Sequence, residues 1–293
     1  SSGRKKTATT ANNILTSVKT LANVARDEGW IEGEPFGRLI VKEGGADTED
    51  REPWTAAELA QLFATPLFAA YDIPRSPAKA GLDAAYWLPL IAACTGARPS
   101  EIAQLWTDDV AELPGGLVVE FRANAERGQR LKNKASWRAV PIHSALIRLG
   151  FADYWRTVAE DGPRPLFPAL PVKSVNGAAA QFGTWFGDYK RARGFDSTTK
   201  TLHSFRHSVE TELAHAGVPT QLVDAITGHA GQGTGRKVYA ATIRRDAERL
   251  RPWVERLAYR LPDGTDALAL PRVFTAPVWS PSTTTPRKTR AAR

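Results

Sequence analysis

A mostly apolar stretch, LDAAYWLPLIAACT at residues 82–95, constrains the fold of this chain more than any other segment. Gly96 follows it directly, and a glycine in this place is typical of the left-handed turn that ends many helices. The stretch is shorter than the roughly 18 apolar residues that indicate a membrane helix, and no run of that length occurs in the sequence. We therefore expect a buried helix in a protein core, which the 42% apolar residues are sufficient to build.

Other segments show helical spacing of their apolar residues. This spacing predicts a helix over 11–28. Thr55 and Glu58 form a capping box that predicts a short helix to about residue 64. Pro99 suits the first turn of a helix that reaches Leu105. Further helices are predicted over 144–159, 174–193, 203–216, 219–227 and 242–259, the last with a break or restart at Pro252.

Two short segments, 117–122 and 138–142, have the composition of strands. A polar stretch that contains Lys132 and Lys134 separates them, which favours an antiparallel pair. The fold class that follows is mainly α with a small antiparallel β-sheet, an α+β arrangement. The acidic, glycine-rich residues 43–53 (EGGADTEDREP) predict a linker and a domain boundary.

The positive charge is concentrated at the end of the chain. Residues 1–235 carry 26 basic and 26 acidic residues, whereas residues 236–293 carry 13 basic and 5 acidic ones. This accounts for the net charge of +8 and indicates a polyanionic partner such as nucleic acid, with a soluble basic tail as the alternative. The residues expected to follow a DNA backbone are Arg236, Lys237, Arg244 and Arg245.

Cys94 is the only cysteine, so a disulfide within the chain and a zinc site made of several thiolates are excluded. A reducing, intracellular location is the simplest interpretation. Because Cys94 lies in the apolar stretch, we expect a buried, inert thiol.

Six residues have the functional groups for chemistry on a phosphodiester. They are Arg98, Lys132, His203, Arg206, His229 and Tyr239. Two guanidinium groups match phosphate oxygens and can stabilise the charge of a pentacoordinate transition state. A tyrosine hydroxyl can attack phosphorus, and a lysine on a hairpin can protonate a leaving 5′-oxygen. The histidines can accept the tyrosine proton or bind the phosphate.

Taken alone, several of these residues have a structural interpretation. Arg98 could pair with Glu101 at i+3, and Arg206 could pair with Glu210 at i+4. A histidine after a helix-ending glycine could cap a turn, and a tyrosine is most often a half-buried aromatic residue. Charge-bearing residues near a helix often form only a solvated face.

Two spacings leave alternatives open. Lys134 is two residues from Lys132, and either could act as the acid, although the distance to the second strand favours Lys132. His203 and His207 have the i, i+4 spacing of zinc ligands, but no glutamate lies between them. We therefore expect no metal site.

Five motifs, in order, are similar to those of the tyrosine recombinases, also called phage integrases. They are TGARPSEIAQL (95–105), KNKASWRAVPIH (132–143), LHSFRHSVETELAHAG (202–217), LVDAITGHA (222–230) and RKVYAAT (236–242). The resemblance covers about residues 50–260. It implies a tyrosine recombinase catalytic-domain-like fold.

The resemblance also implies a role for each residue. Arg98 and Arg206 would bind the scissile phosphate, and Glu101 would support these arginines. Lys132 would be the general acid. His203 would be the general base or proton shuttle, and His229 a phosphate ligand. Tyr239 would be the nucleophile that forms a 3′-phosphotyrosyl intermediate.

The same resemblance implies the partners and the division of the chain. The partner would be duplex DNA, bound by a homo-tetramer in the cytoplasm at the nucleoid, without metal, ATP or another cofactor, and without a membrane or small-molecule substrate. Residues 1–48 would be a remnant of the helical core-binding domain plus linker, with Glu34-Pro35 where Asn-Pro is common. Residues 49–262 would be the catalytic domain. Residues 263–293 would be a tail, partly disordered or docked on a partner protomer.

Three other functions remain as hypotheses. A type IB topoisomerase or a telomere resolvase would share the tyrosine chemistry. A DNA-binding module without catalysis would keep the basic surface, although all six catalytic positions hold competent residues. A metal-dependent hydrolase would need zinc or magnesium.

Overall fold

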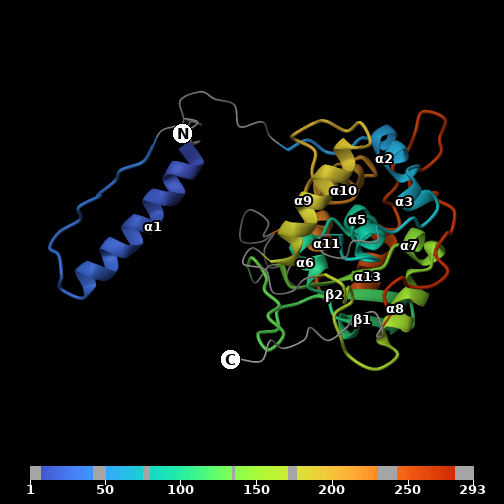
Figure 1. The fold of residues 1–293 in the computed structure, drawn as a ribbon, viewed down its shortest axis with the longest axis horizontal. Helices are drawn as coiled ribbons and strands as arrows, with labels where there is room; N and C mark the ends of the chain where they lie inside the picture. The colour runs from blue at the N-terminus through green and yellow to red at the C-terminus, as the bar shows by residue number, and fades with distance from the viewer. Residues whose placement is uncertain are drawn as a thin grey trace, which may run out of the picture. The chain divides into compact units, whose positions relative to one another are not determined.

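The computed structural model describes residues 8–41, 51–74, 80–133, 136–170, 177–229 and 243–280. The chain divides into two compact units, Ser1–Asp50 and Arg51–Arg293, and Figure 1 shows the elements of both. The division falls within the predicted linker. Among the described residues no helix has the length and apolar character needed to cross a membrane.

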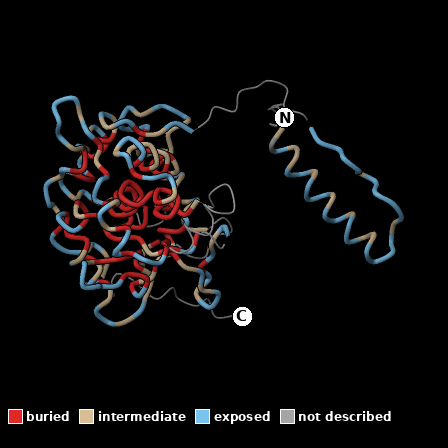
Figure 2. The backbone as a smooth tube through the Cα atoms, turned by 180° about the vertical axis from the view of Figure 1, so that it is seen from behind, coloured by how far each residue is buried: buried red, intermediate tan, exposed pale blue. Residues whose placement is uncertain are grey.

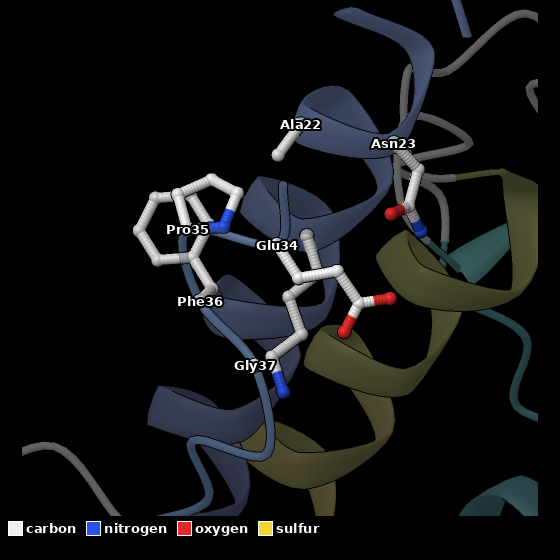
Figure 3. Close-up of a pocket in the computed structure, with 7 residues that line it drawn as sticks. Ala22, Asn23, Glu34, Pro35, Phe36 and Gly37 are labelled. Atoms are coloured by element: carbon white, nitrogen blue, oxygen red, sulfur yellow. The ribbon is translucent and has the colours of Figure 1, made fainter. Parts of the chain in front are cut away.

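The first unit consists of helix α1 (Ala8–Asp27) and a segment that returns along it. The amide of Asn12 donates to the carbonyl of Val41 over 2.9 Å, and the N–H of Val41 donates back to the Asn12 side chain over 2.9 Å. Lys19 donates to the carbonyl of Leu39 over 2.8 Å. Figure 3 shows the shallow hollow between the helix and residues 34–37. The predicted helix over 11–28 is confirmed and begins three residues earlier.

The second unit is built around α5 (Ala84–Thr95), in which every residue is buried. Figure 2 shows this buried centre in red. Gly96 ends the helix in the left-handed region at φ 62°, as expected. A Cβ at this position would lie 2.9 Å from Cγ2 of Thr227 and 3.2 Å from Cγ1 of Val209, so only glycine fits without displacing its neighbours.

Several further helices of this unit lie within the predicted segments. They are α2 (Ala56–Phe63), α6 (Pro99–Ala103), α9 (Ala178–Arg191), α10 (Ser204–His215), α11 (Thr220–Thr227) and α13 (Ala247–Val254). The last is shorter than the region predicted over 242–259, and it continues through Pro252, where a break or restart was expected. The capping box of Thr55 and Glu58 is present at the start of α2. The short helix α3 (Pro66–Ala69) was not expected. Cys94 is buried, and burial raises the pKa of its thiol, as an inert thiol requires.

One helix predicted over 144–159 is two helices in the structure. They are α7 (Ser144–Leu149) and α8 (Phe151–Ala159), which meet at Gly150. Gly150 has φ 99°, a conformation that only glycine adopts readily. The apolar spacing continues across this glycine, which is why the break is not evident in the sequence pattern.

The sheet has three antiparallel strands in the order β1-β2-β3. The two predicted strands are β2 (Gly116–Phe121) and β3 (Arg138–Pro141). Strand β1 (Val110–Leu113) follows a 3-10 turn at Thr107–Asp109 and was not expected. Only the first of its four residues is buried, so the strand lacks the alternation that would reveal it. The sheet confirms the mainly α fold with a small antiparallel sheet.

The residues after α13 pack against their own unit up to Ser280. Phe274 is 2% exposed, and its ring centroid lies 5.5 Å from that of Trp87. The backbone N–H groups of Val278 and Trp279 donate to the buried carboxylate of Asp83. Residues 263–280 therefore add to the core of this unit. Docking on a partner protomer stays a prediction, and residues 281–293 lie outside the described residues.

Candidate active site

Arg98 lies in the short turn between α5 and α6, and its position is fixed by the residues that end the first helix and begin the second. Gly96 ends the first helix, and Pro99 begins the second. The Glu101 carboxylate accepts the backbone N–H of Arg98 over 3.0 Å and its Nη1 over 2.6 Å. Arg98 keeps 15% of its side chain exposed. Glu101 therefore contacts Arg98 directly, and its support of the active-site arginines stays a prediction.

Arg138, at the start of β3, is a second partner of Glu101 that the sequence analysis missed. Its side chain is fully buried, its Nη2 donates to Glu101 over 2.9 Å, and its guanidinium lies over the ring of Phe121. Arg138 and Val140 are two residues apart in the strand and are both buried, whereas Ala139 between them is only partly buried. Because side chains two residues apart in a strand lie on the same face, this spacing was the signal available in the sequence. Burial acts to raise the pKa of Glu101, but Arg138 and Arg98 outweigh it and lower that pKa. The glutamate is therefore ionised and holds both arginines.

Arg206 comes to the same site from α10 and is 1% exposed. Its Nη1 donates to the carbonyls of Gly96 and Thr227. Its Nε lies 3.1 Å from Oε1 of Glu210, one turn further along the helix. Nη2 is buried and has no hydrogen-bond partner among the described residues. Burial, followed by the charges of Arg98 and Arg138, lowers the pKa of Arg206 to about 10, so the residue is charged at neutral pH.

The two candidate histidines flank this arginine. His203 is the N-cap residue of α10, and burial, with the charges of Arg51 and Arg206, lowers its pKa to about 4. His229 follows the left-handed Gly228 that ends α11, and its Nδ1 lies 3.2 Å from Oε1 of Glu210. Burial and Arg206 also lower the pKa of His229. Both imidazoles are therefore mainly neutral at pH 7 and can accept a proton.

Lys132 is exposed in the loop between β2 and β3. The next residue, Asn133, accepts a hydrogen bond from Oγ of Ser136 over 3.1 Å, and the same Oγ accepts Nη1 of Arg98 over 3.1 Å. Ser136 thus ties the loop of the candidate acid to the first arginine. Lys134, the alternative acid, lies outside the described residues.

The described residues end before the candidate nucleophile and resume after it. Tyr239, Arg236 and Lys237 therefore lie outside the described residues. Arg245 is exposed, and its guanidinium carbon lies 3.4 Å from the centre of the Trp137 ring. It is open to solvent, as a contact to DNA would require.

Arg244 differs from the expectation that it faces DNA, because it is 5% exposed. Its Nη2 donates to the carbonyl of His229, and its own carbonyl accepts the N–H of Ala139 over 2.7 Å. Burial lowers the pKa of Arg244. These contacts give Arg244 a structural role, in which it holds the turn of His229 against β3.

The structure brings Arg98, Arg206, His203 and His229 to one site, and two carboxylates hold it in place. Among the described residues no group of three or more His, Cys, Asp or Glu side chains could hold a metal ion. The ring centroids of His203 and His207 lie 5.7 Å apart in an edge-on arrangement. Such a site offers fixed cations to an anionic group and two neutral bases beside it.

The fold is that of a tyrosine recombinase catalytic domain. It is similar to the Tn1549 transposon integrase, solved in complex with a circular intermediate DNA, with a TM-score of 0.53 and 21% identity over 83% of this chain and 78% of that one. A second structure of that integrase, with transposon right end DNA, gives a TM-score of 0.50 and 20% identity, covering 82% and 80% of the two chains. At these identities the likeness concerns the fold.

The sequence identifies the family. Residues 69–244 match the model of the phage integrase family, and the chain belongs to that family. It is also 28% identical over 147 residues to the candidate integrase/recombinase y4rA of Sinorhizobium fredii (strain NBRC 101917 / NGR234). That match covers 49% of this chain and 32% of the relative, so the chain spans about a third of the relative's length. The suspected resemblance to tyrosine recombinases is confirmed.

Proposed function

We propose that this chain is a site-specific DNA recombinase of the integrase type. It cleaves one strand of duplex DNA through Tyr239, forms a 3′-phosphotyrosyl intermediate and rejoins the strand to a new partner. The observation that carries the proposal is the pair of arginines, Arg98 and Arg206, which contact different carboxylates and lie beside neutral histidines.

The arginines bind the scissile phosphate and stabilise its transition state. A guanidinium offers a planar fork of donors that matches phosphate oxygens. Nη2 of Arg206 is buried without a hydrogen-bond partner in the described part of the chain, and such a donor is costly unless a ligand satisfies it. A phosphate oxygen is a ligand of the right charge. Because both arginines are held before the substrate arrives, little reorganisation accompanies the reaction.

Proton transfer falls to Lys132 and His203. Tyr239 loses its proton as its oxygen attacks phosphorus, and a neutral His203 accepts that proton directly or through water. Lys132 donates a proton to the 5′-oxygen that leaves, and the anchored loop of Asn133 and Ser136 supports this position. His229 contributes a further contact to the phosphate.

The phosphotyrosyl ester conserves the energy of the broken bond. Attack by the 5′-hydroxyl of a partner strand reverses the first step, so neither ATP nor a metal ion is needed. The solvent-exposed Arg245, together with Arg236 and Lys237, follows the DNA backbone. Two structures of the Tn1549 integrase contain DNA, which supports duplex DNA as the partner, and a tetramer on DNA is proposed with it.

The experiment that tests recombination places two copies of the attachment site on one plasmid. The site is first selected from random duplexes by binding to the protein. With EDTA present and no ATP, wild-type protein should invert or delete the segment between the two copies. Relaxation of supercoils on plasmids with one copy or none, without exchange, would instead indicate a topoisomerase. Loss of all activity with EDTA would contradict the metal-free mechanism.

A further inference from the structure

Glu210 lies between two candidate catalytic side chains. It comes one helical turn after Arg206 on α10, and its Oε1 is 3.1 Å from Nε of that arginine. The same oxygen is 3.2 Å from Nδ1 of His229, which comes from the end of α11. Oε2 lies 3.5 Å from Nδ1 of His207. One carboxylate therefore joins α10 to the turn that carries His229.

The contact between Glu210 and Arg206 is important because both side chains are largely buried. The side chain of Glu210 is 20% exposed and that of Arg206 is 2% exposed. A buried guanidinium without a counter-ion is strongly unfavourable. Glu101 is already shared by Arg98 and Arg138, and Glu210 is the carboxylate in ion-pair contact with Arg206 among the described residues. The site thus contains two separate acid–arginine groups.

The contacts of Glu210 also restrict orientation. Nε of Arg206 faces Glu210, and Nη1 donates to two backbone carbonyls, so Nη2 is the remaining nitrogen of a rigid, planar fork. A carboxylate beside Nδ1 of His229 favours a proton on that nitrogen, and Nε2 then lies on the opposite side of the ring. Oε1 makes no hydrogen bond of good geometry in the described structure, so the restraint is chiefly electrostatic.

We propose that Glu210 is a positioning residue, whose carboxylate holds Arg206 through Nε and His229 through Nδ1 and leaves Nη2 and Nε2 to meet the scissile phosphate. The inference rests on the proposed function for the identity of the phosphate. The placement of the two side chains by Glu210 can be measured in the free protein.

The charges that face His229 come from several elements. Arg206 and His207 lie on α10 with Glu210, Arg98 lies before α6, and Asp224 lies on α11 with its Oδ1 3.9 Å from Nδ1 of His229. Burial and Arg206 lower the pKa of His229, and Glu210 raises it in opposition. Removing the charge of Glu210 must therefore lower the pKa of His229 further.

The first test is nitrogen NMR of the histidines in the free protein, with Glu210→Gln compared with wild type. We expect wild-type His229 to carry its neutral proton mainly on Nδ1, and the variant to shift toward the Nε2–H tautomer with a lower pKa. Glu212→Gln is the matched control, because it removes the same charge from the same helix, at a residue that contacts His215 instead. An unchanged His229 tautomer and pKa in Glu210→Gln would overturn the proposal.

The second test measures strand cleavage and DNA binding by the same variants. Glu210→Gln should cleave about tenfold more slowly than wild type, while DNA affinity and the control variant stay unchanged. Cleavage at the wild-type rate across the pH range would contradict the proposal. If wild-type protein itself fails to cleave, the proposed function fails, and the NMR result still decides the role of Glu210.

Discussion

At the scale of the residue, the two arginines reach one site from different helices, and a different carboxylate holds each. Glu101 binds Arg98 and Arg138, and Glu210 contacts Arg206. The structural interpretations of Arg98 and Arg206 as ion-pair partners are thus correct, and they are compatible with catalysis. The pairing fixes the guanidinium groups, and a phosphate needs fixed donors.

Replacement of Arg206 separates binding from catalysis. Arg206→Lys keeps the positive charge and loses the planar fork, so it should lower the rate of strand cleavage about a hundredfold or more. The affinity for DNA should change far less, because many phosphate contacts share it. Cleavage on a denaturing gel and binding by fluorescence anisotropy measure the two effects. Equal losses in both would show that Arg206 has no special part in the transition state.

The buried His203 predicts a pH dependence of stability. Its pKa is lowered from 6.5 to about 4, so between these values the unfolded chain binds a proton that the folded chain does not. Above the ordinary pKa of 6.5, His203 therefore does not reduce the stability of the folded protein. As the pH drops from there toward the folded-state pKa of about 4, the stability falls. The Tm of His203→Gln should therefore fall less than that of wild type between about pH 7 and pH 5, measured by calorimetry. Equally steep falls in both proteins would contradict this account.

At the scale of the element, local signals in the sequence predicted much of the site. The capping box at Thr55, the glycine that ends α5 and the proline that begins α6 all appear as expected. These signals are local because each acts through a hydrogen bond or dihedral angle a few residues away. The glycine and the proline alone are enough to place Arg98 at the start of a helix.

The remaining contacts depend on distant segments. Strand β1 is mostly exposed and is held by pairing with β2, so its own four residues carry little pattern. The contact of Glu210 with His229 joins α10 to the end of α11, and nothing in the spacing indicates that these side chains meet. Arg138 is the exception, since its place in an alternating strand does indicate burial.

Alanine substitutions at Gly96 and Gly217, two glycines at helix ends, should lower the stability of the protein by different amounts. Gly96→Ala forces a side chain into the left-handed region and against Thr227, so the free energy of unfolding should fall by about 3 kcal/mol. Gly217 is the matched control at φ 71°, with nothing within 4 Å of its Cβ position. Its alanine variant should lose only about 1 kcal/mol. Urea unfolding measures both, and equal losses would exclude the steric contribution at Gly96.

At the scale of the whole molecule, the catalytic unit extends beyond the family match. That match ends at residue 244, whereas residues to Ser280 pack on the same core. The sequence did not indicate this packing, because the segment has no regular spacing. Its contacts are single anchors, such as Phe274 beside Trp87 and the backbone bonds to Asp83.

Substitution of Phe274 tests whether residues 263–280 are part of the folded unit. Phe274→Ala leaves a cavity in an aromatic cluster and should lower the free energy of unfolding by about 3–5 kcal/mol. Val278→Ala is the control, because Val278 is 44% exposed and should change stability by less than about 1 kcal/mol. Thermal unfolding followed by circular dichroism compares them. A Phe274 variant as stable as the control would show that the segment is not held to the core.

Covalent trapping tests the central proposal most directly. Wild-type protein and Tyr239→Phe are incubated, without metal, with a duplex of the selected attachment site that is nicked shortly after the scissile phosphate. After cleavage the short fragment that carries the new 5′-hydroxyl is lost, so the strand cannot be rejoined. Wild type should give a protein–DNA band on a denaturing gel, with the DNA mapped to Tyr239 by peptide mass spectrometry, while Tyr239→Phe should bind the duplex and give no band. A covalent band with Tyr239→Phe, or none with wild-type protein bound to its site, would contradict the tyrosine mechanism.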